Sequence, residues 1–474
     1  MKSKTQAFGR RSFLRRAVCA GSLLGASAGP QVLSFAQGDK TFRAGEAHVD
    51  ATPPLEIELA GFHYPVGGTP RHITGIRQPA AVRALVLEQN LTQVALVSLD
   101  IAAVSEEMSR SVGKAVAEKT GIPASNVRLC ATHTHSMPTF AYWRQWGLIP
   151  EEYRAAVEAK IVEAVVKAQA DCAEAALFVG GSPAEGGNFN RTSKTWKNEA
   201  EFGPGSSDAD RWLDRLVQVL YLERAGGKPG ILWYHFASHP VCYNDGQAGP
   251  DWPGLVTDRI TAEYGMVPSF LQGHAGDVNP GDGVKWIGEA EPSANAVVAA
   301  IDRAMSRLER IPVDGIGAVE KPMALPLDLE RYRQWLSAYA ENPAACASGV
   351  WVDAGFAKEW YEASVQKNWT EPVLRAPASA IRLGSVGLAF HPSELFSYYG
   401  LAIRRQSPFD HTLVTGYADG SIGYVTDPAA YNEGDGGIYA AVTVPKIIDI
   451  PPFTPEAGRE LAAAMIALLR SATV

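Results

Sequence analysis

Two histidines separated by one residue are the first side chains in this sequence whose types and spacing suggest chemistry. The stretch "RLCATHTHSMPT" carries His133 and His135 at the end of an apolar run that is typical of a strand. Alternate residues of a strand point to the same side, so both imidazoles can face one site. Such a pair could supply two metal ligands, or one ligand and one acid–base group. The alternative is an ordinary polar loop, so the rest of the chain must supply partners.

More histidines follow other strand-like runs. "WYHFASHP" contains His235 and His239, and "LAFHPSELF" contains His391 followed by Glu394. Functional side chains collect where the strands of α/β folds lead into loops. Imidazole nitrogens and a carboxylate oxygen are donors that zinc accepts, with one position left open for water. For His235 and His391 a purely structural role is the alternative interpretation.

The elements that must position these residues can be predicted from hydrophobic patterning. "VRALVLE" and "QVALVSLDI" form a predicted hairpin, and a helix capped by Ser105 and ending near Gly121 leads to the strand before His133. This strand–helix–strand order favours a parallel pair with a crossover helix. The remaining predictions are a helix over 150–171, a hairpin from "RLVQVLYLER" and "GILWYHFASH", strands at "ASAIRL" and "VGLAFH", and a last helix capped at Thr454.

The predicted fold is therefore a single large α/β domain with mixed sheets flanked by helices. "AGEAHVDATPP" is expected to be an irregular segment near its start. Residues 327–370 stand apart as a helical, tryptophan-rich insertion. We expect either an ordinary packed insertion or a lid over a pocket.

Length and charge limit the possible partners. Six of the 43 basic residues, and no acidic ones, lie in the first 36 residues of the 474-residue chain. Without that segment 37 basic residues face 51 acidic ones, a net charge of −14. A surface that follows nucleic-acid phosphates needs an excess of Lys and Arg, so we expect no nucleic-acid partner.

The first 36 residues are predicted to be an export signal. "GRRSFLRRAVCAGSLLGASAG" has paired arginines before a short apolar stretch, in the manner of a twin-arginine signal, and "SFAQ" offers a cleavage site before Gln37. The apolar stretch is too short and glycine-rich for a comfortable membrane span. We therefore expect a periplasmic or secreted protein with no transmembrane anchor after processing, its working domain covering residues 37–474.

A set of motifs also resembles the neutral ceramidase family. These are "VSLDIAAVSEEMSRSVGKAVAEKTGIPASNVRLCATHTHSMP", "NFNRTSKTW", "HFASHP", "GDVNP", "HPSELF" and "GYVTDPAAYNEGDGGIY", which occur in the family's order between about Phe42 and Tyr439. The resemblance implies a zinc-dependent amidase domain that acts on a small-molecule or lipid-like amide. It also implies a site that can be assigned residue by residue.

The resemblance places the zinc ligands at His133, His239, Glu394 and Tyr424, with Tyr424 also counted among the catalytic residues. His135 is the implied acid or oxyanion partner that faces the scissile carbonyl, and Arg191 lines the site. We expect Asn279 and His274, both in the "GHAGDVNPGDG" loop, to contact substrate, as Arg191 does from its own segment. Asp277 of the same loop is expected to orient the loop or a ligand.

Some features depart from the family pattern. Asn279 stands where the family has a serine, which leaves metal-activated water as the expected nucleophile. Met137 stands where a glycine would let substrate approach closely, and we expect no immunoglobulin-like C-terminal domain. We therefore expect a substrate other than ceramide.

Two alternatives to amide hydrolysis remain, and a third is disfavoured. An esterase or lactonase could use the same water attack, and a non-catalytic protein could keep the fold and bind a metal or ligand. A serine hydrolase would need a GxSxG nucleophile elbow, which is absent from residues 37–474.

Overall fold

Two β-sheets packed face to face form the centre of the molecule. The computed structural model describes residues 41–432 and 436–473. The main sheet has nine strands in the order β13-β11-β10-β6-β1-β3-β4-β5, with β15 paired to β6, and the second has four in the order β16-β19-β20-β22. The main sheet contains β1 (Arg43–Asp50), β3 (Ala81–Gln89), β4 (Thr92–Leu99), β5 (Val127–Ala131), β6 (Ala173–Pro183), β10 (Leu216–Arg224), β11 (Ile231–Phe236), β13 (Ser269–Gln272) and β15 (Glu309–Ile311). The second contains β16 (Ile316–Glu320), β19 (Ser379–Leu383), β20 (Val386–Phe390) and β22 (His411–Thr415).

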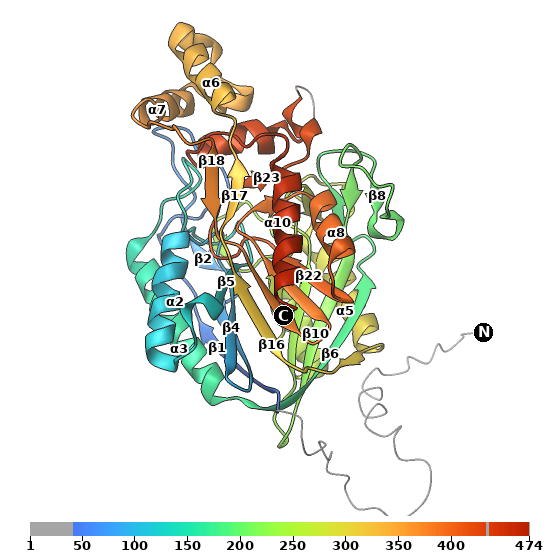
Figure 1. Cartoon of the computed structure of the whole chain (residues 1–474). Helices are drawn as coiled ribbons and strands as arrows, with labels where there is room; N and C mark the ends of the chain where they lie inside the picture. Colours follow the sequence, from blue (N-terminus) through green and yellow to red (C-terminus); the bar gives the residue numbers. More distant parts are fainter. Residues whose placement is uncertain (1–40, 433–435, 474) are drawn as a thin grey trace, which may run out of the picture.

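Helices cover the outer faces of both sheets, which gives four layers (Figure 1). The main sheet is covered by α2 (Glu106–Thr120), α3 (Glu151–Ala170), α4 (Trp252–Tyr264) and α5 (Ala290–Met305), and the second by α8 (Ser397–Gln406) and α10 (Ala457–Ser471). Between the sheets, Leu85 and Leu96 share one buried apolar cluster with Leu388 and Leu413. The prediction of mixed sheets flanked by helices is therefore confirmed.

The predicted crossover unit is present and determines where the first histidine lies. β3 and β4 pair antiparallel, and β4 pairs parallel with β5. Between them, the Ser105 side chain caps α2 by accepting from Met108 N at 3.2 Å, and Gly121 ends the helix at φ 78°. Both sequence-predicted hairpins are also present. Because β5 ends at Ala131, His133 emerges at the carboxyl end of a buried strand.

Two local predictions are wrong. "AGEAHVD" belongs to β1, which pairs along its whole length with β3. Its Gly45 lies so close to α3 that an added Cβ would meet Ala168 O at 2.0 Å, so this strand is determined by distant partners rather than by its own pattern. At the C-terminal end, α10 begins at Ala457, and the Thr454 hydroxyl has no hydrogen-bond partner among the described residues.

Short elements complete the chain around the site. They are β2 (Gly75–Ile76), β7 (Asn188–Asn190), β8 (Lys197–Asn198), β9 (Trp212–Leu213), β12 (Gln247–Ala248), β14 (Val278–Pro280), β17 (Met323–Pro326), β18 (Val373–Ala376), β21 (Glu394–Leu395), β23 (Tyr424–Val425) and α9 (Val444–Ile447). A π-helical turn, η6 (Tyr439–Thr443), leads into α9.

The predicted insertion is helical and lies at the end of the molecule drawn uppermost in Figure 1. It contains α6 (Leu329–Glu341) and α7 (Ala354–Ser364) and is flanked by β17 and β18. Its Trp360 is fully buried, and its Trp335 and Trp351 surround the Lys446 ammonium, with Nζ 3.6 Å and 4.9 Å from the two ring centroids. The insertion is thus packed on α9; the lid stays a prediction.

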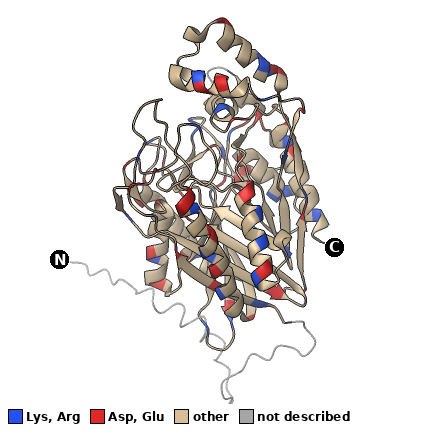
Figure 2. Ribbon diagram, turned by 90° about the vertical axis from the view of Figure 1, so that its left-hand side faces the viewer, with Lys and Arg blue, Asp and Glu red and all other residues tan. Residues whose placement is uncertain are grey.

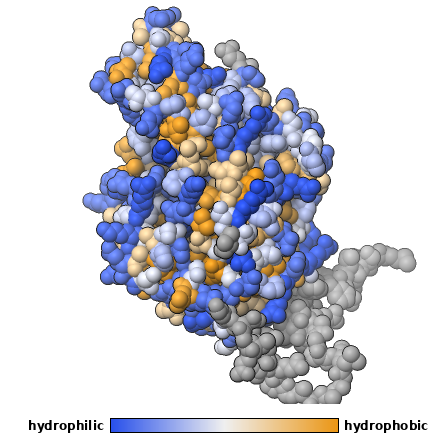
Figure 3. Space-filling view, viewed as in Figure 1, coloured by the Kyte–Doolittle hydropathy of each residue, from blue (hydrophilic) through white to orange (hydrophobic). Residues whose placement is uncertain are grey.

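The surface is mixed in both charge and polarity. Lys and Arg alternate with Asp and Glu over the helices in Figure 2, and apolar residues are interspersed with hydrophilic ones on the face in Figure 3. None of the helices in the described residues is long and apolar enough to cross a membrane. The predicted export signal, residues 1–36, lies outside the described residues.

Candidate metal centre

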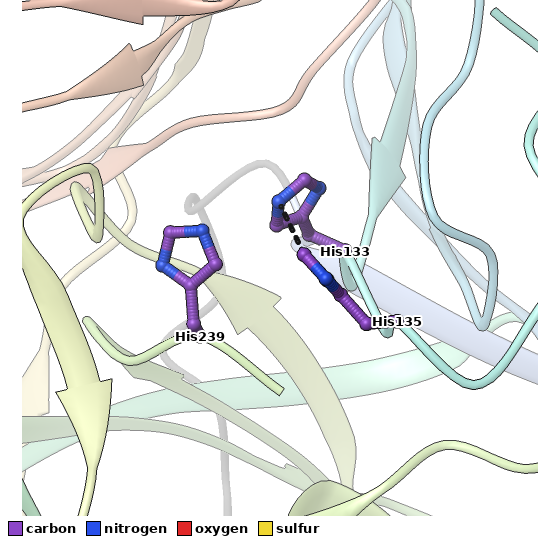
Figure 4. A group of neighbouring side chains, drawn as sticks. All are labelled: His133, His135 and His239. Carbon is purple, nitrogen blue, oxygen red and sulfur yellow. Dashed lines mark hydrogen bonds between the residues drawn. The ribbon is translucent and has the colours of Figure 1, made fainter. Parts of the chain in front are cut away.

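Side chains from three distant parts of the chain converge beyond the ends of their strands. His133 and His135 follow β5, His239 follows β11, and Glu394 begins β21. His135 Nε2 lies 3.2 Å from His133 Nε2, and Glu394 Oε2 lies 3.3 Å from His133 Nε2 and 3.1 Å from His239 Nε2. Figure 4 shows the two imidazoles of the first segment facing each other, with the third beside them. The structure therefore brings together four of the residues that the motifs predicted, His133, His135, His239 and Glu394.

The outer ring nitrogens determine which atom each imidazole presents to the centre. His133 Nδ1 lies 2.8 Å from Ala102 O, His135 Nδ1 lies 3.0 Å from Gly61 O, and His239 Nδ1 lies 3.0 Å from Val278 O. A carbonyl oxygen can only accept, so each Nδ1 carries the proton and each neutral ring turns its Nε2 lone pair inward. Backbone acceptors of this kind orient metal-binding histidines.

The electrostatics of the cluster favour a bound cation. Burial lowers the pKa of His239 to about 4, and Arg191 acts in the same direction. Burial raises the pKa of Glu394, but the neighbouring His133 and His239 outweigh it and hold that pKa well below its usual range. At neutral pH the His239 imidazole is therefore neutral and Glu394 is a carboxylate. The three inward nitrogens lie within 4.8 Å of one another, an arrangement of lone pairs that is unfavourable unless a cation lies between them.

Tyr424 and Arg191 form the next part of the site. Tyr424 in β23 pairs in register with Glu394 in β21, which places both side chains in the same region. Arg191 donates from Nη2 to the Tyr424 hydroxyl at 2.6 Å and to Gly276 O at 2.8 Å. Burial raises the pKa of Tyr424 well above its usual value, and the charge of Arg191 opposes that rise. The guanidinium therefore orients the tyrosine and stabilises negative charge on it.

The "GHAGDVNPGDG" loop supports this part of the site in a different way from the one expected. Asn279 is fully buried, accepts from Arg191 Nη1 at 3.2 Å and donates to Trp286 O. Its side-chain oxygen therefore contacts Arg191, whereas a contact with substrate was expected. Asp277 accepts from Ser397 N at 2.8 Å and so orients the loop, as predicted.

The remaining histidines lie outside the convergent set. His274 Nε2 pairs with Asp214 Oδ2 at 3.1 Å, and His274 is fully buried against Gly400. The structure therefore does not bring His274 to the site as a substrate contact, because its polar edge is directed at a carboxylate. His235 donates to Val414 O at 2.9 Å, and His391 accepts from Ser393 Oγ at 2.9 Å, so both have the structural role offered as the alternative.

His135 is held by a loop that also contacts the insertion. The Phe62 ring meets His135 edge-on at 5.6 Å, and Arg71 donates to His135 O at 2.7 Å. Next to Phe62, His63 Nε2 lies 2.7 Å from Asp353 Oδ2 in the insertion. The insertion is thus connected to the segment that positions His135.

Sequence reasoning missed two tyrosines near the cluster. The ring of Tyr417 lies on His133, with centroids 4.2 Å apart, and Tyr439 lies 6.3 Å from Tyr424. Tyr417 comes soon after β22, so the same rule that selected the histidines after strands could have selected it. His133 and Tyr417 also share left-handed backbone angles, φ 64° and 55°, which are strained for such residues and are enriched at functional sites.

Comparison with known proteins finds similarity to neutral ceramidases. A sequence profile of the N-terminal part of neutral/alkaline non-lysosomal ceramidases matches residues 42–283. Neutral ceramidase B of Dictyostelium discoideum is 27% identical over 266 residues, which cover 51% of this chain but only 36% of that protein. Neutral ceramidase of Pseudomonas aeruginosa is 23% identical over 488 residues, covering 86% of this chain and 69% of that protein.

The fold comparison extends over more of the chain. The crystal structure of the P. aeruginosa neutral ceramidase superposes with a TM-score of 0.67 at 20% identity, covering 91% of this chain and 75% of that one. The structural match thus covers most of the chain, whereas the profile match covers about half of it. From the profile match we conclude that the chain belongs to the neutral/alkaline non-lysosomal ceramidase family.

Proposed function

We propose that this protein is a zinc-dependent hydrolase that cleaves the amide bond of an N-acyl compound. The observation that carries the proposal is the convergence of His133, His239 and Glu394 on one point, each imidazole turned by a backbone carbonyl so that its lone pair faces inward. Tyr424, in register with Glu394, is the proposed fourth ligand. Nitrogen and oxygen donors without sulfur suit a catalytic zinc site.

When bound, zinc supplies Lewis-acid activation of water and of the substrate carbonyl. The chain's own residues supply proton transfer and orientation. Because the Nδ1 proton of His135 is held by Gly61 O, its Nε2 can accept a proton and later donate it to the leaving amine. Arg191 fixes the Tyr424 hydroxyl at 2.6 Å and stabilises negative charge that develops near it.

The proposed substrate is an N-acyl amide other than ceramide. Of the two substituted residues, Met137 is fully buried and belongs to the apolar cluster that contains residues of α2 and α3 and Tyr417. Asn279, which stands where the family has a serine, accepts a hydrogen bond from Arg191 of the proposed site. This substitution at the site supports a substrate other than ceramide. We also propose export to the periplasm or the medium, on the basis of the paired arginines in residues 1–36.

A metal assay followed by a substrate panel tests the proposal. We expect about one zinc per chain in the purified protein, and turnover of at least one N-acyl amide that is lost in His133→Ala. The panel should include ceramide and an ester matched to each amide. Faster turnover of the esters would favour the esterase alternative, and a metal-free protein inert towards the whole panel would favour the binding-protein alternative.

A further inference from the structure

Tyr417 lies against the proposed ligands without being one of the residues that the family motifs assign. Its ring is tilted by 31° over His133 with centroids 4.2 Å apart, and it meets the His239 ring edge-on at 6.2 Å. The residue is held there by its backbone, because Ala131 N donates to Tyr417 O at 3.1 Å at the end of β5. The side chain therefore forms part of the wall around the metal centre.

The hydroxyl of this tyrosine is buried and has no partner. Tyr417 is 4% exposed, and its hydroxyl makes no hydrogen bond to any of the residues that the structure describes. A tyrosine hydroxyl can donate one hydrogen bond, and the ring that carries this one lies against the proposed ligands His133 and His239. A buried hydroxyl without a partner is unfavourable, and this one belongs to a ring that lies on the proposed ligand His133, so a group that occupies the metal centre could satisfy it.

We infer that the Tyr417 hydroxyl is a positioning group that hydrogen-bonds to a solvent oxygen in the metal-loaded site. The inference rests on the proposed metal centre. No protein acceptor reaches the hydroxyl in the described residues, so its partner is the oxygen that enters with the cation. The hydroxyl then orients that oxygen, while the ring keeps the His133 imidazole in place.

The test compares Tyr417→Phe with Tyr234→Phe, using zinc alone as the probe. Tyr234 is a matched control, because its hydroxyl is also buried and unpartnered among the described residues, but its ring stacks on Phe270 at 5.1 Å in the core beside α4 and α5. Zinc affinity is measured by competition with a chromophoric chelator. Thermal unfolding is recorded for the metal-free and the zinc-loaded form of each variant.

We expect Tyr417→Phe to weaken zinc binding by about two- to tenfold, the usual worth of one hydrogen bond. Its metal-free form should unfold at the wild-type temperature or slightly above it, so that the upward shift on adding zinc shrinks. Tyr234→Phe should keep the wild-type zinc affinity and the wild-type shift. Equal zinc affinities for wild type and Tyr417→Phe, or equal losses in both variants, would overturn the inference. Failure of the wild-type protein to bind zinc would instead defeat the proposed function.

Discussion

Replacing either histidine of the pair by alanine should have different consequences, although the two residues are neighbours on one segment. His133 and His135 are two residues apart, and each donates from Nδ1 to a backbone carbonyl, at 2.8 Å and 3.0 Å. The structure brings both Nε2 atoms to the same centre. Only His133 has the carboxylate of Glu394 within 3.3 Å. We therefore expect His133→Ala to remove a ligand and His135→Ala to remove a proton-transfer group.

The expected magnitudes follow from the number of donors. Binding of zinc to a four-donor site in proteins is worth about 10–16 kcal/mol, so one donor accounts for about 2.5–4 kcal/mol. His133→Ala should thus weaken zinc binding by roughly 10²- to 10³-fold. His135→Ala should weaken it by less than about tenfold and, with zinc saturating, lower kcat by about 10²- to 10⁴-fold, the usual contribution of a positioned acid–base group.

Both variants are measured in the same way. Zinc affinity is determined by competition with a chelator, and kcat is measured on the N-acyl amide that the wild-type protein turns over fastest. His72→Ala is a suitable control, because among the described residues its imidazole hydrogen-bonds only to a nearby carbonyl, with Nδ1 3.1 Å from Pro70 O. An equal loss of zinc in His133→Ala and His135→Ala would refute the reasoning and make His135 a ligand.

Three further predictions concern the surroundings of the site. Burial raises the pKa of Asp214, but its arginine and histidine partners outweigh burial and hold that pKa well below its usual range. Its contribution to stability is therefore complete above about pH 4 and lost as the pH falls below that value. Asp214→Asn should lower the free energy of unfolding by about 3–5 kcal/mol at pH 7 and should make that free energy, measured by urea unfolding, less dependent on acid pH. An acid dependence equal to that of the wild-type protein would contradict this. Arg191→Lys should lower kcat by about 10- to 100-fold, because an ammonium lacks the planar fork that contacts both Tyr424 and a carbonyl; wild-type kinetics would show that the fork is unimportant. Asp353→Asn should change the free energy of unfolding by less than about 1 kcal/mol, because its pair with His63 is partly exposed; a loss above about 3 kcal/mol would show that this pair holds the insertion in place.

Much of the fold could be predicted because its elements have strong local signals. The hairpin of β3 and β4 and the crossover through α2 follow from apolar runs, a serine cap and a terminal glycine. β1 could not be predicted, because its small and polar residues are fixed as a strand by β3 and by the close approach of α3 to Gly45. The packing of two sheets against each other likewise depends on contacts between distant segments.

The site could likewise be predicted only where local patterns or family motifs pointed to its residues. The rule that functional groups follow strands selected the histidines and Glu394, and the family motifs added Tyr424 and Arg191. The rule also selected His235 and His391, which the structure uses for backbone and serine contacts. His274 was expected at the substrate because it shares a loop with Asn279. Its partner Asp214 lies 60 residues earlier in the chain, and only the folded structure shows that contact.

X-ray absorption at the zinc edge of the purified, substrate-free protein tests the convergence of these donors most directly. We predict one zinc per chain with only nitrogen and oxygen neighbours at about 2.0–2.2 Å, including the outer-shell scattering typical of imidazole, and loss of that signal in His133→Ala. Sulfur neighbours near 2.3 Å, or a spectrum that His133→Ala leaves unchanged, would show that the metal binds elsewhere and would contradict the assignment.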